Sequence, residues 1–170
     1  MGLKDTLTAA VDALKKESIP HALIGGFALA AYGVARATQD IDLLVDGSDH
    51  QKVKQVMLNA GFKLVHESAE VLQLSGIGQL DILYANRDLS LKMLANSKRF
   101  NQFPLPIVAI EDLIGLKIQA YVNDPKREYQ DKADILALLQ NNTEVNYDII
   151  KKYADIFKQW PAIEELISKI

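Results

Sequence analysis

Residues 24–45 constrain the fold of this chain more than any other stretch of its sequence. Two adjacent glycines, Gly25 and Gly26, follow a short apolar segment and precede a run of small residues that is typical of a helix. After thirteen intervening residues, Asp40 and Asp42 flank an isoleucine at the start of another apolar segment. Alternate residues of a strand point to opposite faces, so the two aspartates share one face and the apolar residues share the other. No hydrophobic core requires two carboxylates there, and we therefore expect this stretch to carry the chemistry of the protein.

Hydrophobic periodicity predicts strands and helices first, and helices alone afterwards. Helices are expected over residues 3–17, 27–32, 48–59, 88–98, 111–121 and 128–139, and strands over 21–24, 41–45, 62–66, 71–74 and 78–84. The last 25 residues also have a helical pattern, which Pro161 divides. Ser48 and Gln51 form a capping-box pattern at the start of one helix. This order predicts an α+β or mixed α/β domain, with a core over 1–108 and a helical C-terminal part over 109–170 that packs on it as a single compact unit.

Composition excludes several classes of protein. Hydrophobic residues make up 49% of the 170 residues and charged residues 24%, which is enough to bury a substantial core. No apolar run approaches the roughly 20 residues of a membrane-spanning helix, and the charged, amphipathic first 18 residues do not resemble a signal peptide, so we expect a cytoplasmic protein that contacts no membrane. The chain has no cysteine, which excludes disulfides and thiolate chemistry. Its net charge of −3 gives no basic footprint for sequence-independent nucleic-acid binding.

A third strand-borne carboxylate, Asp81, interrupts another apolar segment. Asp40 and Asp42 have Cα atoms about 6.5–7 Å apart if they lie on a strand, where their charges repel. A divalent cation reverses that repulsion, since Mg²⁺ prefers oxygen ligands and commonly uses carboxylates together with substrate phosphates. With Asp81 on a neighbouring strand, the three could hold a two-metal cluster that acts at phosphorus. The alternative is that Asp40 and Asp42 only keep a sheet edge soluble.

The glycine pair lies where a strand turns into a helix. Backbone N–H groups at such a position attract anions, and Gly25 and Gly26 would allow a polyphosphate to approach the backbone closely. A tight turn that packs the helix is the alternative. The three histidines, His21, His50 and His66, have no metal-ligand spacing and are expected at ordinary surface or strand positions.

These motifs together resemble the polymerase-β-like nucleotidyltransferase superfamily, whose fold is a small mixed sheet flanked by helices. The resemblance rests on Gly25, Gly26, Ala28, Arg36, Thr38, the run from Asp40 to Leu43, and Asp81. This pattern is similar both to the AbiEii-like toxin branch and to the branch that adenylylates aminoglycosides and lincosamides. The resemblance implies that Asp40, Asp42 and Asp81 are catalytic metal ligands for two Mg²⁺ or Mn²⁺ ions, with Asp81 also a general base. Arg36 and Thr38 would contact the triphosphate, although a structural loop role is an equal alternative for Thr38.

The C-terminal half extends the resemblance to AbiEii-like proteins. Lys117, Ala120, Arg127, Asp131 and Asp134 follow the order of a lysine-bearing helix, an arginine and an Asp-x-x-Asp in that group. Lys117 and Arg127 are predicted to bind the nucleotide, with Lys117 at a phosphate and with snorkelling to solvent as its alternative, and Asp131 and Asp134 are further candidate site residues. Asp131 and Asp134 share a helix face, and Arg127 is placed to pair with Asp131 at i,i+4. The alternative for this group, Arg127 included, is a solvated, salt-bridged face without contact to nucleotide.

The implied function is Mg²⁺-dependent transfer of a nucleoside monophosphate from a nucleoside triphosphate to a hydroxyl acceptor. RNA, protein and small molecules are all candidate acceptors, and the AbiEii-like resemblance adds a toxin role with an antitoxin partner. One alternative is an antibiotic nucleotidyltransferase with an acidic drug pocket, to which Glu67, Glu70 and Asp88 could contribute. Another is a non-catalytic nucleotide-binding or antitoxin module. The apolar C-terminal helices are a candidate dimer interface, and the sequence leaves the oligomeric state open.

Overall fold

The computed structural model describes residues 2–170, which fold into two compact units. The first contains the chain up to Ala28 together with Arg36–Val108, and the second contains Leu29–Ala35 together with Ala109–Ile170. The sequence-based boundary after residue 108 therefore leaves out one short segment, Leu29–Ala35, that belongs to the second unit. Across residues 2–170, no helix combines the length and the apolar character needed to cross a membrane.

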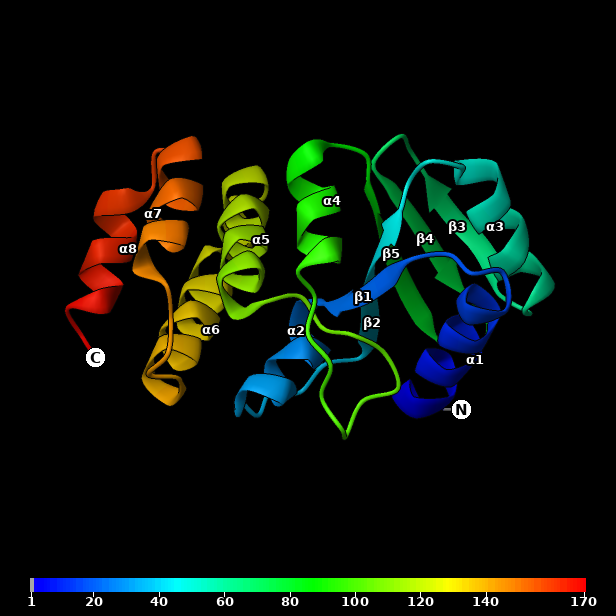
Figure 1. Ribbon diagram of the computed structural model, residues 1–170, viewed down its shortest axis with the longest axis horizontal. Coiled ribbons are helices and arrows are strands. Elements are labelled where there is room, and N and C mark those ends of the chain that lie inside the picture. Colours follow the sequence, from blue (N-terminus) through cyan, green and yellow to red (C-terminus); the bar gives the residue numbers. More distant parts are fainter. Residues whose placement is uncertain (1) are drawn as a thin grey trace. The chain divides into compact units, whose positions relative to one another are not determined.

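A five-stranded mixed sheet forms the centre of the first unit (Figure 1). Its strands are β1 (His21–Ile24), β2 (Asp40–Asp46), β3 (Lys63–Glu67), β4 (Val71–Ser75) and β5 (Gln79–Ala85), in the spatial order β1-β2-β5-β4-β3. β2 and β5 are parallel, and every other pair is antiparallel. The predicted meander over β3, β4 and β5 is confirmed, and its last strand returns to lie beside β2.

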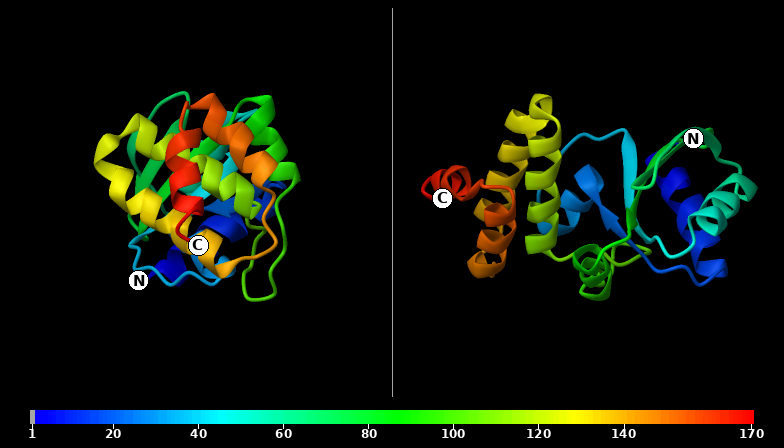
Figure 2. Two further views of the ribbon diagram at one scale, coloured as in Figure 1. Left: turned by 90° about the vertical axis from the view of Figure 1, so that its left-hand side faces the viewer. Right: turned by 90° about the horizontal axis from the view of Figure 1, so that it is seen from above.

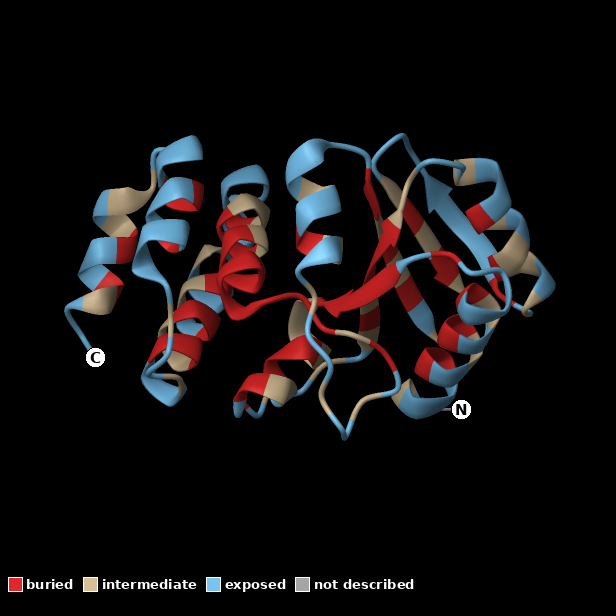
Figure 3. Ribbon diagram, viewed as in Figure 1, coloured by how far each residue is buried: buried red, intermediate tan, exposed pale blue. Residues whose placement is uncertain are grey.

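Helices cover both faces of this sheet. In Figure 1, α1 (Leu3–Lys16) and α3 (His50–Asn59) lie on one side of it, and α2 (Gly25–Ala28) and α4 (Asp88–Ala95) lie on the other. The apolar residues of β2 are buried, whereas Asp40 and Asp42 on the opposite face are only half-buried, so the predicted division of this strand is confirmed. Figure 3 shows the contrast across the sheet: the central strands are largely buried, and the edge strand β3 is exposed along its whole length.

The start of α3 differs from the sequence-based expectation by one residue. Asp49, rather than Ser48, is the N-cap residue, and its Oδ1 accepts a hydrogen bond from the Lys52 amide at 2.9 Å. The Ser48 amide instead donates to Asp46 Oδ1 at 2.8 Å, in the turn that leaves β2. The predicted Ser48–Gln51 capping box is therefore wrong, because aspartate caps a helix as well as serine does and stands one residue closer to it.

The second unit is helical throughout. It comprises a 3₁₀ helix (Leu29–Tyr32), α5 (Ile110–Asn123), a 3₁₀ turn (Pro125–Arg127), α6 (Glu128–Asn141), α7 (Tyr147–Ile156) and α8 (Trp160–Ile167). α5 packs against both α6 and α7, as Figure 2 shows, and it buries most of its surface. Pro161 lies in the first turn of α8, where its missing N–H costs nothing. The α+β fold with a helical C-terminal part is thus confirmed.

Candidate functional site

Two of the three predicted catalytic carboxylates lie side by side. Asp42 on β2 and Asp81 on β5 are direct partners in the parallel ladder, and strands so paired run about 4.8 Å apart. Asp40 is two residues before Asp42 and therefore on the same face, opposite Gln79. All three aspartates are half-buried. The sheet order thus places the three predicted site residues on one face although Asp81 is far from the others in the sequence.

Gly25 lies directly against the Asp42 carboxylate. The antiparallel β1–β2 pairing places Ile24 opposite Asp42, so the chain turns out of β1 just beside this side chain. Gly25 has φ = +69°, and a Cβ atom built on it would lie 2.2 Å from Asp42 Oδ2. Asp42 can therefore hold its position only if residue 25 has no side chain and adopts this positive φ, and glycine meets both requirements.

Replacing Gly25 by alanine is expected to be more costly than the same change at Gly33. Gly33 has a similar φ of +76°, but a Cβ atom built on it would have no neighbour within 4 Å. Gly33→Ala should therefore cost about 1–2 kcal/mol of stability from backbone strain alone. Gly25→Ala should cost a further 1–3 kcal/mol, roughly, because the Asp42 side chain must move away. Urea unfolding of the two variants measures the difference. Equal losses at the two positions would contradict the close packing of Gly25 on Asp42.

Gly26, Arg36 and Thr38 also come together, next to the aspartates. A Cβ atom on Gly26 would lie 3.2 Å from Thr38 Oγ1 and 3.5 Å from Arg36 Nη1. The Thr38 hydroxyl donates to the Asp40 carbonyl oxygen at 3.3 Å, so this side chain has a structural role in the loop that enters β2. α2 has only four residues before the backbone becomes 3₁₀. Its helix dipole is therefore small, and attraction for a phosphate would come mainly from the Arg36 guanidinium and the backbone N–H groups.

The three carboxylates suit a hard divalent cation both in the type of their ligand atoms and in their positions on the paired strands. All of their ligand atoms are oxygens, which Mg²⁺ prefers. Asp42 and Asp81 are direct partners on paired strands, and Asp40 is two residues before Asp42. Within residues 2–170, no three histidine, cysteine or acidic side chains already converge on one point as a metal-binding group. The donor set therefore fits such a metal in its chemistry, and a bound metal would have to draw the carboxylates together.

One polar neighbour of the site escaped the sequence analysis. Gln73 on β4 is the direct ladder partner of Asp81 on the side away from Asp42, and it is half-buried on the same face. Its side-chain amide extends the polar row of Asp42 and Asp81 across a third strand. The alternation of β4, in which Gln73 stands between two buried leucines, is the signal that could have identified it.

The remaining predicted site residues lie in the second unit, where they form a buried ionic cluster. Lys117 Nζ on α5 donates to Asp131 Oδ1 at 3.2 Å and to Asp134 Oδ2 at 2.7 Å on α6. Arg127 Nε donates to Asp131 Oδ2 at 3.0 Å, which confirms the expected i,i+4 pair. Gln130 donates to the other oxygen of Asp134 at 3.1 Å. All four carboxylate oxygens therefore accept a hydrogen bond, as buried charges require.

This cluster differs from the solvated face that was considered as an alternative. Asp131 is 1% exposed and both Lys117 and Asp134 are 4% exposed, whereas Arg127 and Gln130 at the edge of the cluster reach solvent. Lys117 does not snorkel to solvent, since its ammonium group ends between two carboxylates of the adjacent helix. Contact of Lys117 with a nucleotide phosphate stays a prediction. In the structure its ammonium group pairs with Asp131 and Asp134, which the sequence did not indicate.

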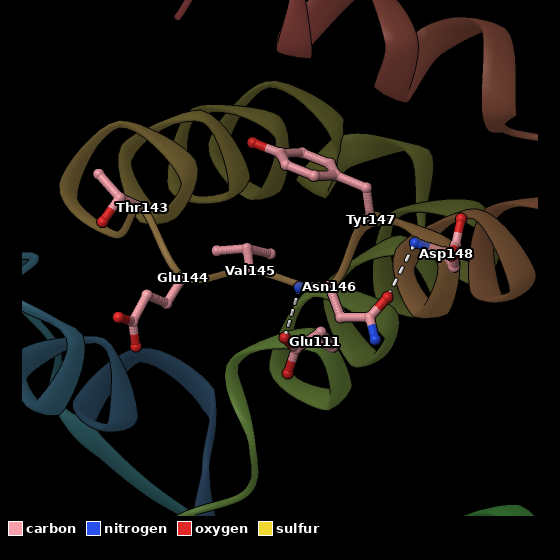
Figure 4. A pocket seen from close by; sticks show the side chains of 7 residues that line it. All are labelled: Glu111, Thr143, Glu144, Val145, Asn146, Tyr147 and Asp148. Carbon is pink, nitrogen blue, oxygen red and sulfur yellow. Dashed lines mark hydrogen bonds between the residues drawn. The ribbon is translucent and has the colours of Figure 1, made fainter.

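A pocket of about 520 Å³ in the second unit contains none of the predicted site residues (Figure 4). It is formed by the segment that joins α6 to α7, including Glu144, by Tyr147 at the start of α7 and by Glu111 at the start of α5. Glu111 Oε1 accepts a hydrogen bond from the Asn146 amide at 2.8 Å, as Figure 4 shows. This carboxylate therefore anchors the connection between the two helices.

The chain is similar in structure to solved nucleotidyltransferases. No family model and no curated protein matches its sequence. The antibiotic-resistance factor ANT(2'')-Ia aligns with a TM-score of 0.69 over 95% of both chains at 15% identity. The lincosamide antibiotic adenylyltransferase LnuA aligns with a TM-score of 0.61 over 83% of this chain and 99% of its own, at 19% identity.

A third solved structure extends the likeness beyond antibiotic modification. A putative nucleotidyltransferase from Thermotoga maritima, TM1012, aligns with a TM-score of 0.52 over 78% of this chain and 92% of its own, at 19% identity. Identities this low carry the fold and not the substrate. The chain therefore has the fold of the nucleotidyltransferases, as the family resemblance of its glycine and aspartate motifs implied.

Proposed function

We propose that this protein is a metal-dependent nucleotidyltransferase that moves a nucleoside monophosphate from a nucleoside triphosphate to a hydroxyl acceptor. The observation that carries the proposal is the pairing of Asp42 with Asp81 across the parallel strands, with Asp40 on the same face. Two neighbouring carboxylates repel each other in the absence of a cation, and a protein retains such a pair where its function requires it.

Asp40, Asp42 and Asp81 would hold the metal, and the family resemblance implies that two ions bind there. Bound there, Mg²⁺ or Mn²⁺ would neutralise the charge of the triphosphate. Arg36, beside Gly26, is placed to bind a phosphate oxygen, and a glycine at that position keeps the approach open.

The chemistry at the acceptor is assigned to Asp81. Its carboxylate would accept the proton of the attacking hydroxyl as the new P–O bond forms and as the bond to the pyrophosphate leaving group breaks. Catalysis would depend mainly on positioning and on charge neutralisation, since no covalent intermediate with the protein is needed. Gln73, next to Asp81, is placed to orient that carboxylate through its amide.

Labelling of acceptor pools tests the proposal directly. The purified protein is incubated with Mg²⁺ and each of the four α-³²P-labelled ribonucleoside triphosphates, in the presence of total RNA, cell lysate protein or a panel of aminoglycosides and lincosamides. We expect transfer of label in one pool, dependent on Mg²⁺ or Mn²⁺ and accompanied by release of pyrophosphate. Binding of triphosphate without transfer in any pool would instead favour the non-catalytic nucleotide-binding or antitoxin module.

An antibiotic acceptor is the second candidate. Two of the similar structures, ANT(2'')-Ia and LnuA, are described as acting in antibiotic resistance or on a lincosamide, and the former matches this chain over almost its full length. Of the carboxylates suggested for a drug pocket, Glu67 pairs with Lys54 at 2.7 Å and Glu70 with Arg87 at 2.9 Å. Those two charges are already balanced, so a cationic drug would need other partners. Label in RNA or in protein would instead support the AbiEii-like toxin role, for which an antitoxin partner is part of the proposal.

A further inference from the structure

The first unit contains a second pocket, away from the predicted catalytic face. It has a volume of about 550 Å³ and lies at the start of β1, whereas Gly25 and the aspartates lie at the end of that strand. Its apolar lining comes from Ile19 before β1, from Leu91 and Leu94 of α4, and from Pro106. A largely apolar pocket with a few converging polar groups is the usual form of a small-molecule site.

The wall of this pocket is held firmly in place. The Leu23 amide of β1 donates to the Pro106 carbonyl at 2.8 Å. The backbones of Lys98 and Ile107 exchange two further hydrogen bonds, at 2.7 and 2.8 Å, which fix the segment that carries Arg99 to the pocket. The polar groups of the pocket are therefore positioned by backbone pairing and not by a mobile loop.

His21 lines this pocket and carries a buried hydrogen-bonding atom without a partner. It is 9% exposed, and its Nδ1 lies 2.7 Å from the Ile19 carbonyl oxygen, so Nδ1 carries the proton. Nε2 is buried and has no hydrogen-bond partner within residues 2–170. Burial, together with the positive charges of Lys15 and Arg99, lowers the pKa of His21, so the ring is neutral and Nε2 is an acceptor near pH 7. A buried acceptor of this kind is costly unless a ligand or a water supplies a donor.

The charges around His21 are mainly positive. Lys15 and Arg99 line the pocket with it, and Lys15 Nζ is already bound to the Pro104 carbonyl at 2.6 Å. Arg99 forms no ion pair with any residue that the structure describes. Asp46 is the acidic residue of the lining, and its Oδ1 already accepts from the Ser48 amide. The guanidinium of Arg99 is therefore the group that remains available to an anion.

We propose that this pocket binds a small amphipathic anion that carries an O–H or N–H donor. The apolar body would lie against Leu91, Leu94 and Pro106, the donor would bind His21 Nε2, and the anionic group would bind Arg99. This ligand class differs from a nucleoside triphosphate, and the site is independent of the metal-binding aspartates.

A titration of the full chain followed by protein NMR tests the proposal with 4-hydroxybenzoate as the probe. We expect saturable shifts at the amides of residues 19–21 and 91–99. 4-Methoxybenzoate lacks the donor and 4-hydroxybenzamide lacks the charge, and each should bind roughly three- to tenfold more weakly. Equal affinity for 4-hydroxybenzoate and its methoxy analogue would overturn the role of Nε2, and no saturable shift at these amides with any of the three would overturn the site.

Three variants complete the test from the side of the protein. His21→Asn keeps a donor for the Ile19 carbonyl but lacks Nε2, so it should bind the hydroxy and methoxy probes equally. Arg99→Gln should weaken the carboxylate probe roughly tenfold and leave the amide probe unchanged. Lys98→Gln removes a neighbouring exposed charge outside the lining and is the matched control, with no expected change. If His21→Asn fails to fold, the probe comparison in the unaltered protein and Arg99→Gln still decide the outcome.

Discussion

Asp42→Asn is expected to lower the rate of nucleotide transfer, as kcat/KM, by about a thousandfold while the protein stays folded. The asparagine keeps the size of the side chain beside Gly25 but removes the charge that we propose would hold a metal ion next to Asp81. A thousandfold corresponds to about 4 kcal/mol of transition-state stabilisation, which is in the range that a bound metal supplies. Initial rates with the acceptor identified by labelling measure the effect, and Asp81→Asn should give a loss of similar size.

Asp12→Asn is the matched control for this change. Asp12 is an exposed carboxylate on α1 in the same unit, so its replacement alters the net charge equally without touching the site. We expect its rate to equal that of the unaltered protein. A loss of less than tenfold in Asp42→Asn, with Asp12→Asn unchanged, would contradict the assignment of Asp42 as a metal ligand.

Stabilisation by ligands should also distinguish Asp42→Asn from the unaltered protein. Asp42 and Asp81 are direct partners on paired strands, so a cation bound between them would offset the repulsion of their charges. Addition of Mg²⁺ and triphosphate should then stabilise the unaltered protein but not the variant, because stabilisation by a ligand requires its binding. Thermal unfolding with and without these ligands measures this difference and separates a lost site from a damaged fold.

Lys117→Met is expected to cost about 3–5 kcal/mol of the free energy of unfolding. The methionine fills the space of the lysine stem but leaves Asp131 and Asp134, both at most 4% exposed, without their shared ammonium partner. Removal of one member of a buried ion pair leaves uncompensated charge, which is the origin of the penalty. Arg127→Met is the comparison variant: the Arg127 side chain is 52% exposed, and its loss leaves one oxygen of Asp131 without a donor, which should cost less, about 1–3 kcal/mol.

A triple variant distinguishes the structural role of Lys117 from contact with nucleotide. Adding Asp131→Asn and Asp134→Asn to Lys117→Met removes the stranded charges and should recover most of the lost stability. If the lysine has only the structural role, the triple variant should keep the original KM for the triphosphate. A KM raised tenfold or more in this folded variant would support the predicted phosphate contact. A cost below about 1 kcal/mol in Lys117→Met alone would contradict the buried cluster.

The sequence predicted the local features of the fold well. Alternation placed Asp40 and Asp42 on one face of β2, and the i,i+4 spacing paired Arg127 with Asp131, because both relations depend on the geometry of a single strand or helix. The start of α3 was misplaced by one residue because Ser48 and Asp49 are both good caps, and only the path of the chain out of β2 selects between them.

Relations between distant residues could not be read from periodicity. Nothing in the pattern of β5 states that Asp81 stands beside Asp42, since the order of strands in a sheet depends on tertiary packing; the chemistry of three carboxylates and the family resemblance suggested it instead. Lys117 looked like a lysine on a narrow polar face because its partners, Asp131 and Asp134, lie on the next helix. The unpartnered Nε2 of His21 was hidden for the same reason: burial and the absence of a donor are properties of the folded surroundings.

The parallel pairing of β2 with β5 also has a consequence for how this protein folds. β1 and β2 are near neighbours along the chain, and so are β3, β4 and β5. In contrast, β2 and β5 are adjacent in the sheet but are separated in the sequence by α3, β3 and β4. Contacts that close long loops form slowly because the entropy of closure is lost before the contacts repay it. Asp42 and Asp81 should therefore come together in the last phase of refolding, and triphosphate binding should recover more slowly than helical circular dichroism after dilution from urea.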